Sequence, residues 1–334
     1  MSVRIVTYNL LLPILAEQPG NYVASRPEYL KTEYRWKLIR SQLEQEIHSY
    51  KNTIICLQEV SNTLLSTLQA FFHQMNYKFF ESLYNNKHND YRGVALAVPA
   101  NLPLIYKNAV TIGEHLRLTI QSFDATFNSL SWWKIVKYSI TKTFKDQSIN
   151  SWEKAMSLKN VLICVGVMVH GRPLFVGTYH MPCLFRDPSI MIIHASAAKD
   201  LMFQIANGHP FVLAGDFNMQ PIDSAYRAIT RRGNVEDRVL PKVGNRGVTY
   251  RFNKQQVLRS AYREKNKAEP NYTNFARTGQ SSNSFCGTLD YIFFAGNLTV
   301  LDVLPLPSHP TGKSYPDRTH PSDHLMLAAT LQLI

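Results

Sequence analysis

Short apolar runs alternate with amphipathic stretches along almost the whole chain. The apolar runs are typical of buried strands, and they lie at Val3–Tyr8, Thr53–Leu57, Gly93–Val98, Val161–Val169, Leu174–Thr178, Phe211–Ala214, Leu289–Phe294 and Leu325–Leu333. Other stretches place apolar residues at helical spacing, as Trp36, Ile39 and Leu43 do. These predicted helices are Glu33–Ile47, about Thr63–Met75, and Met191–Gln204. The pattern predicts an α/β fold.

The order of these elements favours one large domain over residues 1–334. Strands and helices alternate without the regular rhythm or the glycine signature of a dinucleotide-binding fold. No repeat of fixed period and no Pro/Ser/Gly-rich linker divides the chain. Residues 105–159, which contain Trp132, Trp133 and Trp152, are predicted to be an insertion. A lid or substrate-edge element and a plain packed insertion both remain open for it.

Polar side chains repeatedly stand where an apolar strand ends. A core strand does not normally finish in a carboxylate, because burying an unpaired charge is costly. Any one such position could be a solvated strand end, but so many in one chain favour a shared site. Carboxylates, amides and histidines together suit a hard cation and a phosphate. The positions are Asn9, Glu59, His180, Asp216, Asn218, Asp290, Asp323 and His324.

These segments resemble, in chain order, the signatures of the endonuclease/exonuclease/phosphatase superfamily. The matching segments are Thr7-Tyr8-Asn9, Leu57-Gln58-Glu59, Gly215-Asp216-Phe217-Asn218, Leu289-Asp290-Tyr291 and Ser322-Asp323-His324. The resemblance implies the DNase-I-like fold, a four-layer α/β sandwich in which two packed mixed β-sheets are flanked by helices. It also implies a metal-dependent hydrolase of phosphoric esters.

A narrower resemblance points to one branch of that superfamily. This branch contains the carbon-catabolite-repressor-type deadenylases, nocturnin, the Angel proteins and the 2′-phosphodiesterases. The segments that carry the resemblance are Pro27-Glu28-Tyr29-Leu30, Tyr34-Arg35-Trp36, Leu258-Arg259-Ser260-Ala261-Tyr262, Glu269-Pro270-Asn271-Tyr272-Thr273-Asn274 and Tyr291-Ile292-Phe293-Phe294. The chain departs from the branch after His180, where it reads Met181-Pro182-Cys183-Leu184-Phe185.

The resemblance assigns roles to the predicted site residues. Glu59, Asn9 and Asp323 are expected to hold Mg²⁺, with Mn²⁺ as a possible substitute. The expected catalytic residues are His180, Asp216, Asn218, Asp290 and His324. Asp216 would orient or deprotonate the attacking water, and Asp290 would fix the tautomer of His324. Whether Asp216 or His324 accepts the proton of the water is left open.

The charge of the chain indicates a polyanionic partner. Lys and Arg total 36 against 24 Asp and Glu, which gives a formal net charge of +12. Residues 230–277 mix basic and aromatic side chains, as a single-stranded RNA site does, although a solvated basic face is also compatible. We therefore expect substrate contacts from Arg251, Lys254 and Arg259. The family resemblance adds Asn160, which matches an asparagine near the phosphate, and Phe285, which stands where relatives place a base-stacking phenylalanine. The rival partners are a small phosphate ester and an anionic membrane.

The predicted function is a 3′-end exoribonuclease of deadenylase-like type. The alternatives are a phosphatase acting on a nucleotide, a 2′,3′-cyclic phosphate end or a phosphoinositide, and a non-catalytic RNA-binding relative. The four cysteines are far apart, which favours reduced thiols inside the cell, in the cytoplasm or nucleus. The longest apolar run, Val161–Val169, is too short to span a bilayer. We expect a soluble monomer, and the sequence indicates no protein partner.

Overall fold

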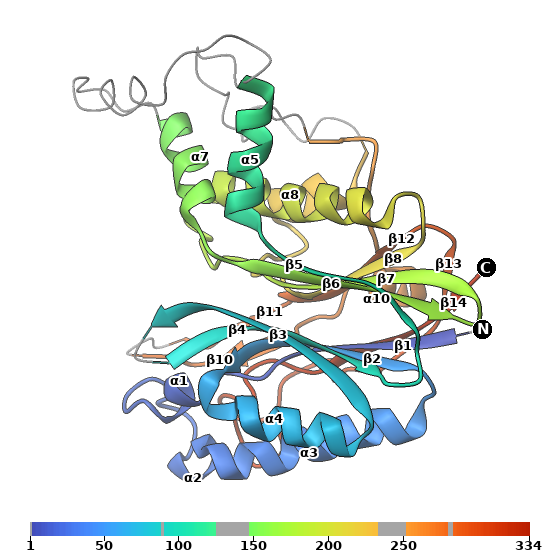
Figure 1. Ribbon diagram of the computed structural model, residues 1–334. Coiled ribbons are helices and arrows are strands. Elements are labelled where there is room, and N and C mark those ends of the chain that lie inside the picture. The colour runs from blue at the N-terminus through green and yellow to red at the C-terminus, as the bar shows by residue number, and fades with distance from the viewer. Residues whose placement is uncertain (1, 88–89, 125–146, 233–251, 280–282) are drawn as a thin grey trace.

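The computed structural model describes residues 2–87, 90–124, 147–232, 252–279 and 283–334 (Figure 1). Two mixed β-sheets pack face to face, and helices cover the outer face of each (Figure 1). The first sheet has the order β13-β14-β1-β2-β4-β3. Its strands are β1 (Ser2–Asn9), β2 (Thr53–Ser61), β3 (Tyr77–Lys87), β4 (Asp90–Pro99), β13 (Leu298–Val303) and β14 (Leu327–Leu333).

The second sheet has the order β5-β6-β7-β8-β12-β9. Its strands are β5 (Leu104–Thr111), β6 (Val161–Val169), β7 (Arg172–His180), β8 (Phe211–Asp216), β9 (Arg259–Ser260) and β12 (Asp290–Ala295). A short ribbon of β10 (Asn274–Ala276) and β11 (Phe285–Gly287) stands apart from both sheets. The parallel pairs are β1 with β2 and β7 with β8, and the remaining pairs are antiparallel.

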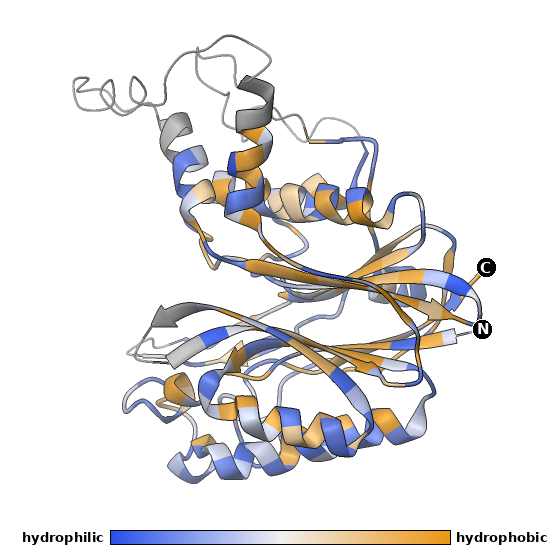
Figure 2. Cartoon of the chain, viewed as in Figure 1, coloured by the Kyte–Doolittle hydropathy of each residue, from blue (hydrophilic) through white to orange (hydrophobic). Residues whose placement is uncertain are grey.

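Three layers of apolar side chains hold the sandwich together. In β6, Val161, Ile163 and Val165 face the first sheet, whereas Leu162 and Cys164 face the helices of the second. Both faces of the central strands are therefore covered, which explains why they read as continuous apolar runs. Figure 2 shows this apolar colouring along both sheets and mixed colouring on the helices.

Helices α3 (Thr32–Ser49) and α4 (Asn62–Gln74) cover the first sheet (Figure 1). Helices α5 (Ile112–Asp124), α7 (Gln147–Ser157) and α8 (Pro188–Ala206) lie over the second sheet (Figure 1). Short helices complete the set: α1 (Pro13–Glu17), α2 (Pro27–Leu30), α9 (Ser224–Thr230) and α10 (Ala261–Asn266). Within the described residues no helix has the length and apolar character that a membrane span requires.

The predicted four-layer α/β sandwich is confirmed, and every predicted strand and helix is present. The prediction missed β3, β5 and β13, which lie at sheet edges. Strands β3 and β5 carry many polar residues, and half of the residues of β13 are exposed. Part of the predicted insertion at 105–159 belongs to the sandwich, because β5 is an edge strand and α5 and α7 pack beside α8. Trp152 is buried there, whereas Trp132 and Trp133 lie outside the described residues.

Candidate active site

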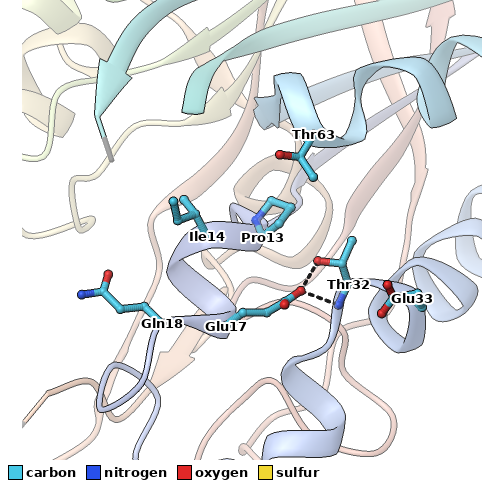
Figure 3. Close-up of a pocket in the computed structure, with 7 residues that line it drawn as sticks. All are labelled: Pro13, Ile14, Glu17, Gln18, Thr32, Glu33 and Thr63. Carbon is cyan, nitrogen blue, oxygen red and sulfur yellow. Dashed lines mark hydrogen bonds between the residues drawn. The ribbon is translucent and has the colours of Figure 1, made fainter. Parts of the chain in front are cut away.

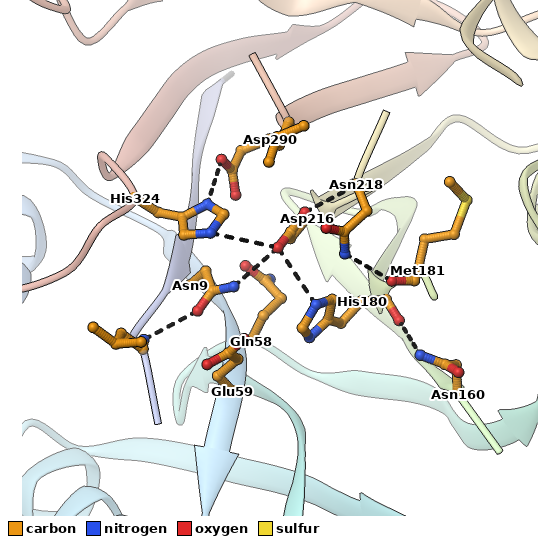
Figure 4. Close-up of polar contacts among 12 residues, drawn as sticks. Asn9, Gln58, Glu59, Asn160, His180, Met181, Asp216, Asn218, Asp290 and His324 are labelled. Carbon is orange, nitrogen blue, oxygen red and sulfur yellow. Dashed lines mark hydrogen bonds and ion pairs between the residues drawn. The ribbon is translucent and has the colours of Figure 1, made fainter. Parts of the chain in front are cut away.

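The predicted site residues meet at one end of the sandwich. The parallel strands β1 and β2 carry Asn9 and Glu59 at their carboxyl ends, and β7 and β8 carry His180 and Asp216. The antiparallel strand β12 starts at this same end, where Asp290 pairs with Asp216. We call the resulting group the polar cluster (Figure 4). It comprises Asn9, Glu59, His180, Asp216, Asn218, Asp290 and His324.

Asp216 lies at the centre of the polar cluster. Its Oδ2 accepts a hydrogen bond from Asn9 Nδ2 at 2.9 Å, so it links the two sheets. The same oxygen lies 3.4 Å from His180 Nε2 and 3.7 Å from His324 Nε2 (Figure 4). Its Oδ1 accepts from the backbone N–H of Asn218 at 2.9 Å. Both oxygens of this buried carboxylate are thus held in place by neighbouring donors.

The backbone around Asp216 requires the residues that the sequence provides. A Cβ atom on Gly215 would lie 1.9 Å from the carbonyl oxygen of Tyr179, so only glycine lets β8 approach β7 here. Asn218 adopts a left-handed conformation with φ 48°, which asparagine tolerates well. Its Nδ2 donates to the carbonyl of Met181 at 2.9 Å. These constraints explain why the strand ends in a Gly-Asp-Phe-Asn turn.

Asp290 and His324 form a buried pair. His324 Nδ1 lies 2.8 Å from Asp290 Oδ2, which also accepts from Thr273 Oγ1 at 2.6 Å. Burial acts to lower the pKa of His324, but the carboxylates of Asp290, Asp216 and Asp323 outweigh it and raise that pKa well above its usual value. The surrounding carboxylates thus favour the imidazolium form of His324, while burial raises the pKa of Asp290 to about 6. The contact between His324 and Asp290 is the one that the predicted role of Asp290 requires, and that role stays a prediction.

Glu59 sits at an irregularity in β2. The pairing with β4 shifts between Gln58 and Val60, so Glu59 is the extra residue of a β-bulge, with φ 55°. Bulges of this kind re-aim side chains near active sites. Glu59 Oε2 accepts from the backbone N–H of Leu12 at 2.8 Å, and its other oxygen has no donor among the described residues.

Asp323 lies beside the polar cluster and is itself well satisfied. Its Oδ2 accepts from the hydroxyl of Tyr22 at 2.9 Å, and its Oδ1 lies 3.4 Å from Ser322 Oγ. The hydroxyl of Ser322 donates to the carbonyl of Asn9 at 2.7 Å. Asp323 thus connects to residues behind the site, and direct metal ligation by it stays a prediction.

Arg35 of α3 joins the two loops on which Asn9 and His324 depend. Its side chain is 1% exposed, and it donates to the carbonyls of Leu10, Leu11 and Pro321. Burial lowers the pKa of Arg35, while the charge of Asp323 acts in the opposite direction. Sequence reasoning used this arginine only as part of a family resemblance and missed its role. Its position on an otherwise amphipathic helix gives no signal of what it binds.

The predicted substrate-binding residues are dispersed. Asn160 Nδ2 donates to the carbonyl of His180 at 2.8 Å, so it borders the polar cluster. Phe285 is 42% exposed on β11. Arg259 pairs with Phe294, which is four residues along β12 from Asp290 and so roughly 13 Å away. Its guanidinium is occupied by Glu264 and by the carbonyls of Gly296 and Leu298.

The structure says less about the last two predicted substrate-binding residues, Arg251 and Lys254. Arg251 lies outside the described residues. Lys254 belongs to a segment that buried Lys199 anchors to α8, through the carbonyls of Asn253 and Gln256. Contact of either residue with substrate stays a prediction. A surface pocket near Arg259 also has Arg231 and Arg263 in its lining.

The donor set of the polar cluster fits a divalent cation. Asp290 Oδ1 is buried and has no hydrogen-bond partner among the described residues. Ligand atoms of Asp216, Asp290 and His324 lie within 4.8 Å of one another. An imidazolium cannot ligate a metal, so carboxylate and amide oxygens are the better ligands for a hard cation. Metal ligation by Glu59, which has a free oxygen, and by the nearby Asn9 stays a prediction.

A surface pocket opens between α1 and the starts of α3 and α4, whose residues line it (Figure 3). The carboxylate of Glu17 accepts from the backbone N–H of Thr32 at 2.8 Å and from its hydroxyl (Figure 3). None of the residues predicted from sequence for the active site lines this pocket.

Comparison with known proteins agrees with the geometry. The 2′,5′-phosphodiesterase 12 of Homo sapiens is 26% identical over 352 residues, covering 99% of this chain and 51% of that protein. The nocturnin of Drosophila melanogaster is 24% identical and is matched over 47% of its length by 100% of this chain. The chain thus spans about half the length of these curated relatives.

Solved structures share the fold. The structure of ANGEL2, a 2′,3′-cyclic phosphatase, in complex with adenosine-2′,3′-vanadate superposes with a TM-score of 0.69 at 17% identity. It is matched over 96% of its length by 100% of this chain. The human nocturnin catalytic domain with bound sulfate gives a TM-score of 0.63 at 20% identity, with coverage of 100% of this chain and 95% of that one.

A family model described as "Endonuclease/Exonuclease/phosphatase family" matches residues 6–324, which run from β1 to His324. The match therefore includes every residue of the polar cluster. It confirms the resemblance on which the predicted roles rested, and it supports the predicted enzyme class, a hydrolase of phosphoric esters. The chain belongs to the Endonuclease/Exonuclease/phosphatase family.

Proposed function

We propose that this protein is a Mg²⁺-dependent phosphodiesterase that hydrolyses RNA, working from the 3′ end. One observation carries the proposal: the whole polar cluster converges at one end of the sandwich, with Asp216 at its centre. A binding protein without activity would have no need of a buried imidazolium–carboxylate pair beside a carboxylate that holds the two sheets together.

The residues of the cluster divide the chemistry among them. Asp216 is placed to orient the attacking water and to accept its proton, since both of its oxygens are fixed by neighbouring donors. His324 is held as a cation by Asp290, so it offsets the negative charge that develops on the phosphate. His180 and Asn218 offer further donors on the β7 and β8 side of the site.

Glu59 and Asn9 would hold the metal, and the carboxylate of Asp290 completes the negative surroundings. When bound, the cation polarises a phosphoryl oxygen as a Lewis acid. The bulge at Glu59 turns its free oxygen away from the sheet ladder, where it is available as a ligand. Relatives named for phosphodiesterase activity support the proposed class of reaction.

The RNA substrate is supported by charge and by the relatives. The net charge of +12 attracts a polyanion, and the exposed ring of Phe285 offers a surface on which a base could stack. Phe285 also lies close to the polar cluster, because its ring faces Gly287, three residues before Asp290.

A product analysis tests the proposal. Purified protein is incubated with 5′-labelled oligoadenylate in 3′–5′ and in 2′–5′ linkage, mixed-sequence RNA, single-stranded DNA and RNA ending in a 2′,3′-cyclic phosphate. Each substrate is tested with Mg²⁺ and with a chelator, beside an Asp216→Asn control. We expect stepwise shortening of RNA from the 3′ end that requires Mg²⁺. Removal of a terminal phosphate without shortening would instead establish a phosphatase.

A further inference from the structure

The strand β4 carries an arginine beside the active site that the proposed chemistry does not use. This residue is Arg92, and the strands on both sides of it contain a bulge. In β2 the extra residue is Glu59, and in β3 the pairing shifts between Leu83 and Asn85, so the extra residue is Tyr84. Between them, Arg92 pairs with Ser61 on one side and with Asn85 on the other. Two bulges at one point of a sheet re-aim side chains locally.

The next residue, Gly93, permits this distortion. A Cβ atom there would lie 1.8 Å from the carbonyl oxygen of Ser82, so β3 can approach β4 only because residue 93 is glycine. The sheet is therefore shaped around Arg92 by its neighbours on both sides. Such a specific backbone arrangement favours a functional role over a solvated surface position.

Arg92 faces the space between the two sheets. Side chains alternate along a strand, and Val94, Leu96 and Val98 of β4 all pack in the apolar layer between the sheets. Arg92 continues this row by one step, beyond the end of that layer, and it pairs with Ser61, two residues after Glu59. Its guanidinium thus enters the mouth of the active site from the first sheet.

Two titratable groups near the site respond to the charge of Arg92. Burial raises the pKa of Tyr84, and Arg92 opposes that change, while Glu59 and Asp216 add to it. The thiol of Cys183 responds to the same groups, since burial and the carboxylates of Asp216 and Glu59 raise its pKa and Arg92 lowers it. Arg92 thus acts on the same two groups, Tyr84 and Cys183, as the carboxylates of Glu59 and Asp216 do.

The guanidinium of Arg92 has no hydrogen-bond or ion-pair partner in the part of the chain that is described. Glu59, its nearest acidic neighbour in the sheet, accepts from the backbone of Leu12 instead. Arg92 is only partly exposed. A half-buried cation with five unused donors, next to a site for phosphate chemistry, is suited to an anionic group of the substrate.

We propose that Arg92 binds a phosphate of the substrate other than the one that is hydrolysed, an inference that rests on the proposed phosphodiesterase function. The preferred substrate would then carry a second phosphate beside the scissile one, as an RNA strand or a phosphorylated dinucleotide does. A dinucleotide that lacks this group would lose the contact. Arg92 would thus determine specificity without taking part in bond breaking.

The test compares dinucleotides in whichever linkage the protein cleaves. The substrates are diadenylate without a terminal phosphate, with a 5′ phosphate, and with a 3′ phosphate. The readout is kcat/KM for each phosphorylated form divided by kcat/KM for the plain form. We expect a ratio of about 10 to 100 for one of the two forms in the wild type, as a charge-assisted contact would give. Arg92→Gln should bring the ratio near one, and Arg92→Lys should leave an intermediate value.

Arg172→Gln is the matched control, because Arg172 is exposed at the opposite end of β7 and its loss changes the net charge equally. It should keep the wild-type ratio. A wild-type ratio of one, or a ratio that Arg92→Gln leaves intact, would overturn the proposal while the phosphodiesterase function stands.

Absence of any hydrolysis would instead count against the proposed function, and binding then decides the role of Arg92. Calorimetry with the Asp216→Asn protein should show tighter binding of one phosphorylated form than of the plain form. Adding Arg92→Gln should remove that difference. A melting curve for each variant separates loss of the contact from loss of the fold, and equal affinities of the Asp216→Asn protein for all three forms would reject the proposal.

Discussion

At the scale of single residues, the active site is a set of side chains whose partners restrict them to one arrangement. Asp216 shows this most clearly, because Asn9, His180 and His324 all point at one of its oxygens. Asn9 comes from the first sheet and His180 from the second. The contacts of the Asp216 carboxylate therefore depend on how the two sheets pack together. Small displacements of either sheet would change the reacting geometry.

Asp290 and His324 should act as a unit. If Asp290 serves to hold His324 as a cation, the loss of either residue removes the same contribution to the transition state. We expect Asp290→Asn and His324→Gln each to lower kcat by about 10²–10³-fold. The double variant should be little worse than the poorer single one. Turnover measured at saturating RNA tests this, and barrier increases that simply add would show that the two residues act independently.

At the scale of elements, strand ends and loops bring the residues together. Arg35 of α3 is a positioning residue, since it contacts the loops after Asn9 and before Ser322 but no member of the polar cluster is bonded to it. Replacement of Arg35 would remove the guanidinium that donates to the three carbonyls. The two loops could then move relative to each other.

Arg35→Lys should therefore lower kcat by about 10-fold or more and change KM less, because a small displacement of catalytic groups costs far more in turnover than in binding. Arg40→Lys is the control on the exposed side of the same helix, where Arg40 pairs with Glu44. Steady-state kinetics decide the split between kcat and KM. An Arg35→Lys protein with a lower melting temperature but unchanged kcat would assign Arg35 a purely structural role.

Helix α8 contains a buried histidine that makes folding stability depend on pH. His194 Nδ1 lies 2.8 Å from the hydroxyl of Tyr179, and Nε2 lies 2.9 Å from the carbonyl of Ala155. Burial lowers the pKa of His194 to about 4. The unfolded chain binds this proton below about pH 6.5, whereas the folded protein does not bind it until about pH 4.

The free energy of unfolding should consequently fall as the pH drops from 6.5 to 4, by about 3 kcal/mol from this group. Urea unfolding at pH 7 and pH 4.5 measures the loss, and His194→Gln should make it smaller. His48→Gln serves as the control, because His48 is exposed at the end of α3. An identical loss in wild type and His194→Gln would contradict the assignment.

Burial determines how much of the fold and of the site could be predicted from the sequence. The central strands were predictable because both faces are covered and their residues are apolar throughout, as in β6. The site was predictable because polar residues such as Asp216 and Asp290 interrupt that pattern. Edge strands β3 and β5 gave no such signal. The bulge at Tyr84, the reach of Arg92 and the contacts of Arg35 depend on register and packing between distant segments, which no local pattern contains.

At the scale of the whole molecule, the sandwich supplies each half of the site from a different sheet. The first sheet contributes Asn9 and Glu59, and the second contributes His180, Asp216 and Asp290. The chain carries a net charge of +12, whereas the charged groups of the site itself are mainly acidic. Such a division suits a polyanion that is drawn to the surface while a cation offsets the carboxylates at the centre.

The most direct test of this account is the dependence of RNA hydrolysis on Mg²⁺ in the wild type, in Glu59→Gln and in the surface control Arg172→Gln. We predict that turnover by the wild type and by Arg172→Gln rises with Mg²⁺ to the same plateau and is abolished by a chelator. Glu59→Gln should need far more Mg²⁺ and reach a plateau lower by about 10³-fold, while circular dichroism shows an intact fold. Hydrolysis by Glu59→Gln with the wild-type dependence on Mg²⁺ would contradict the assignment of the metal and of the site.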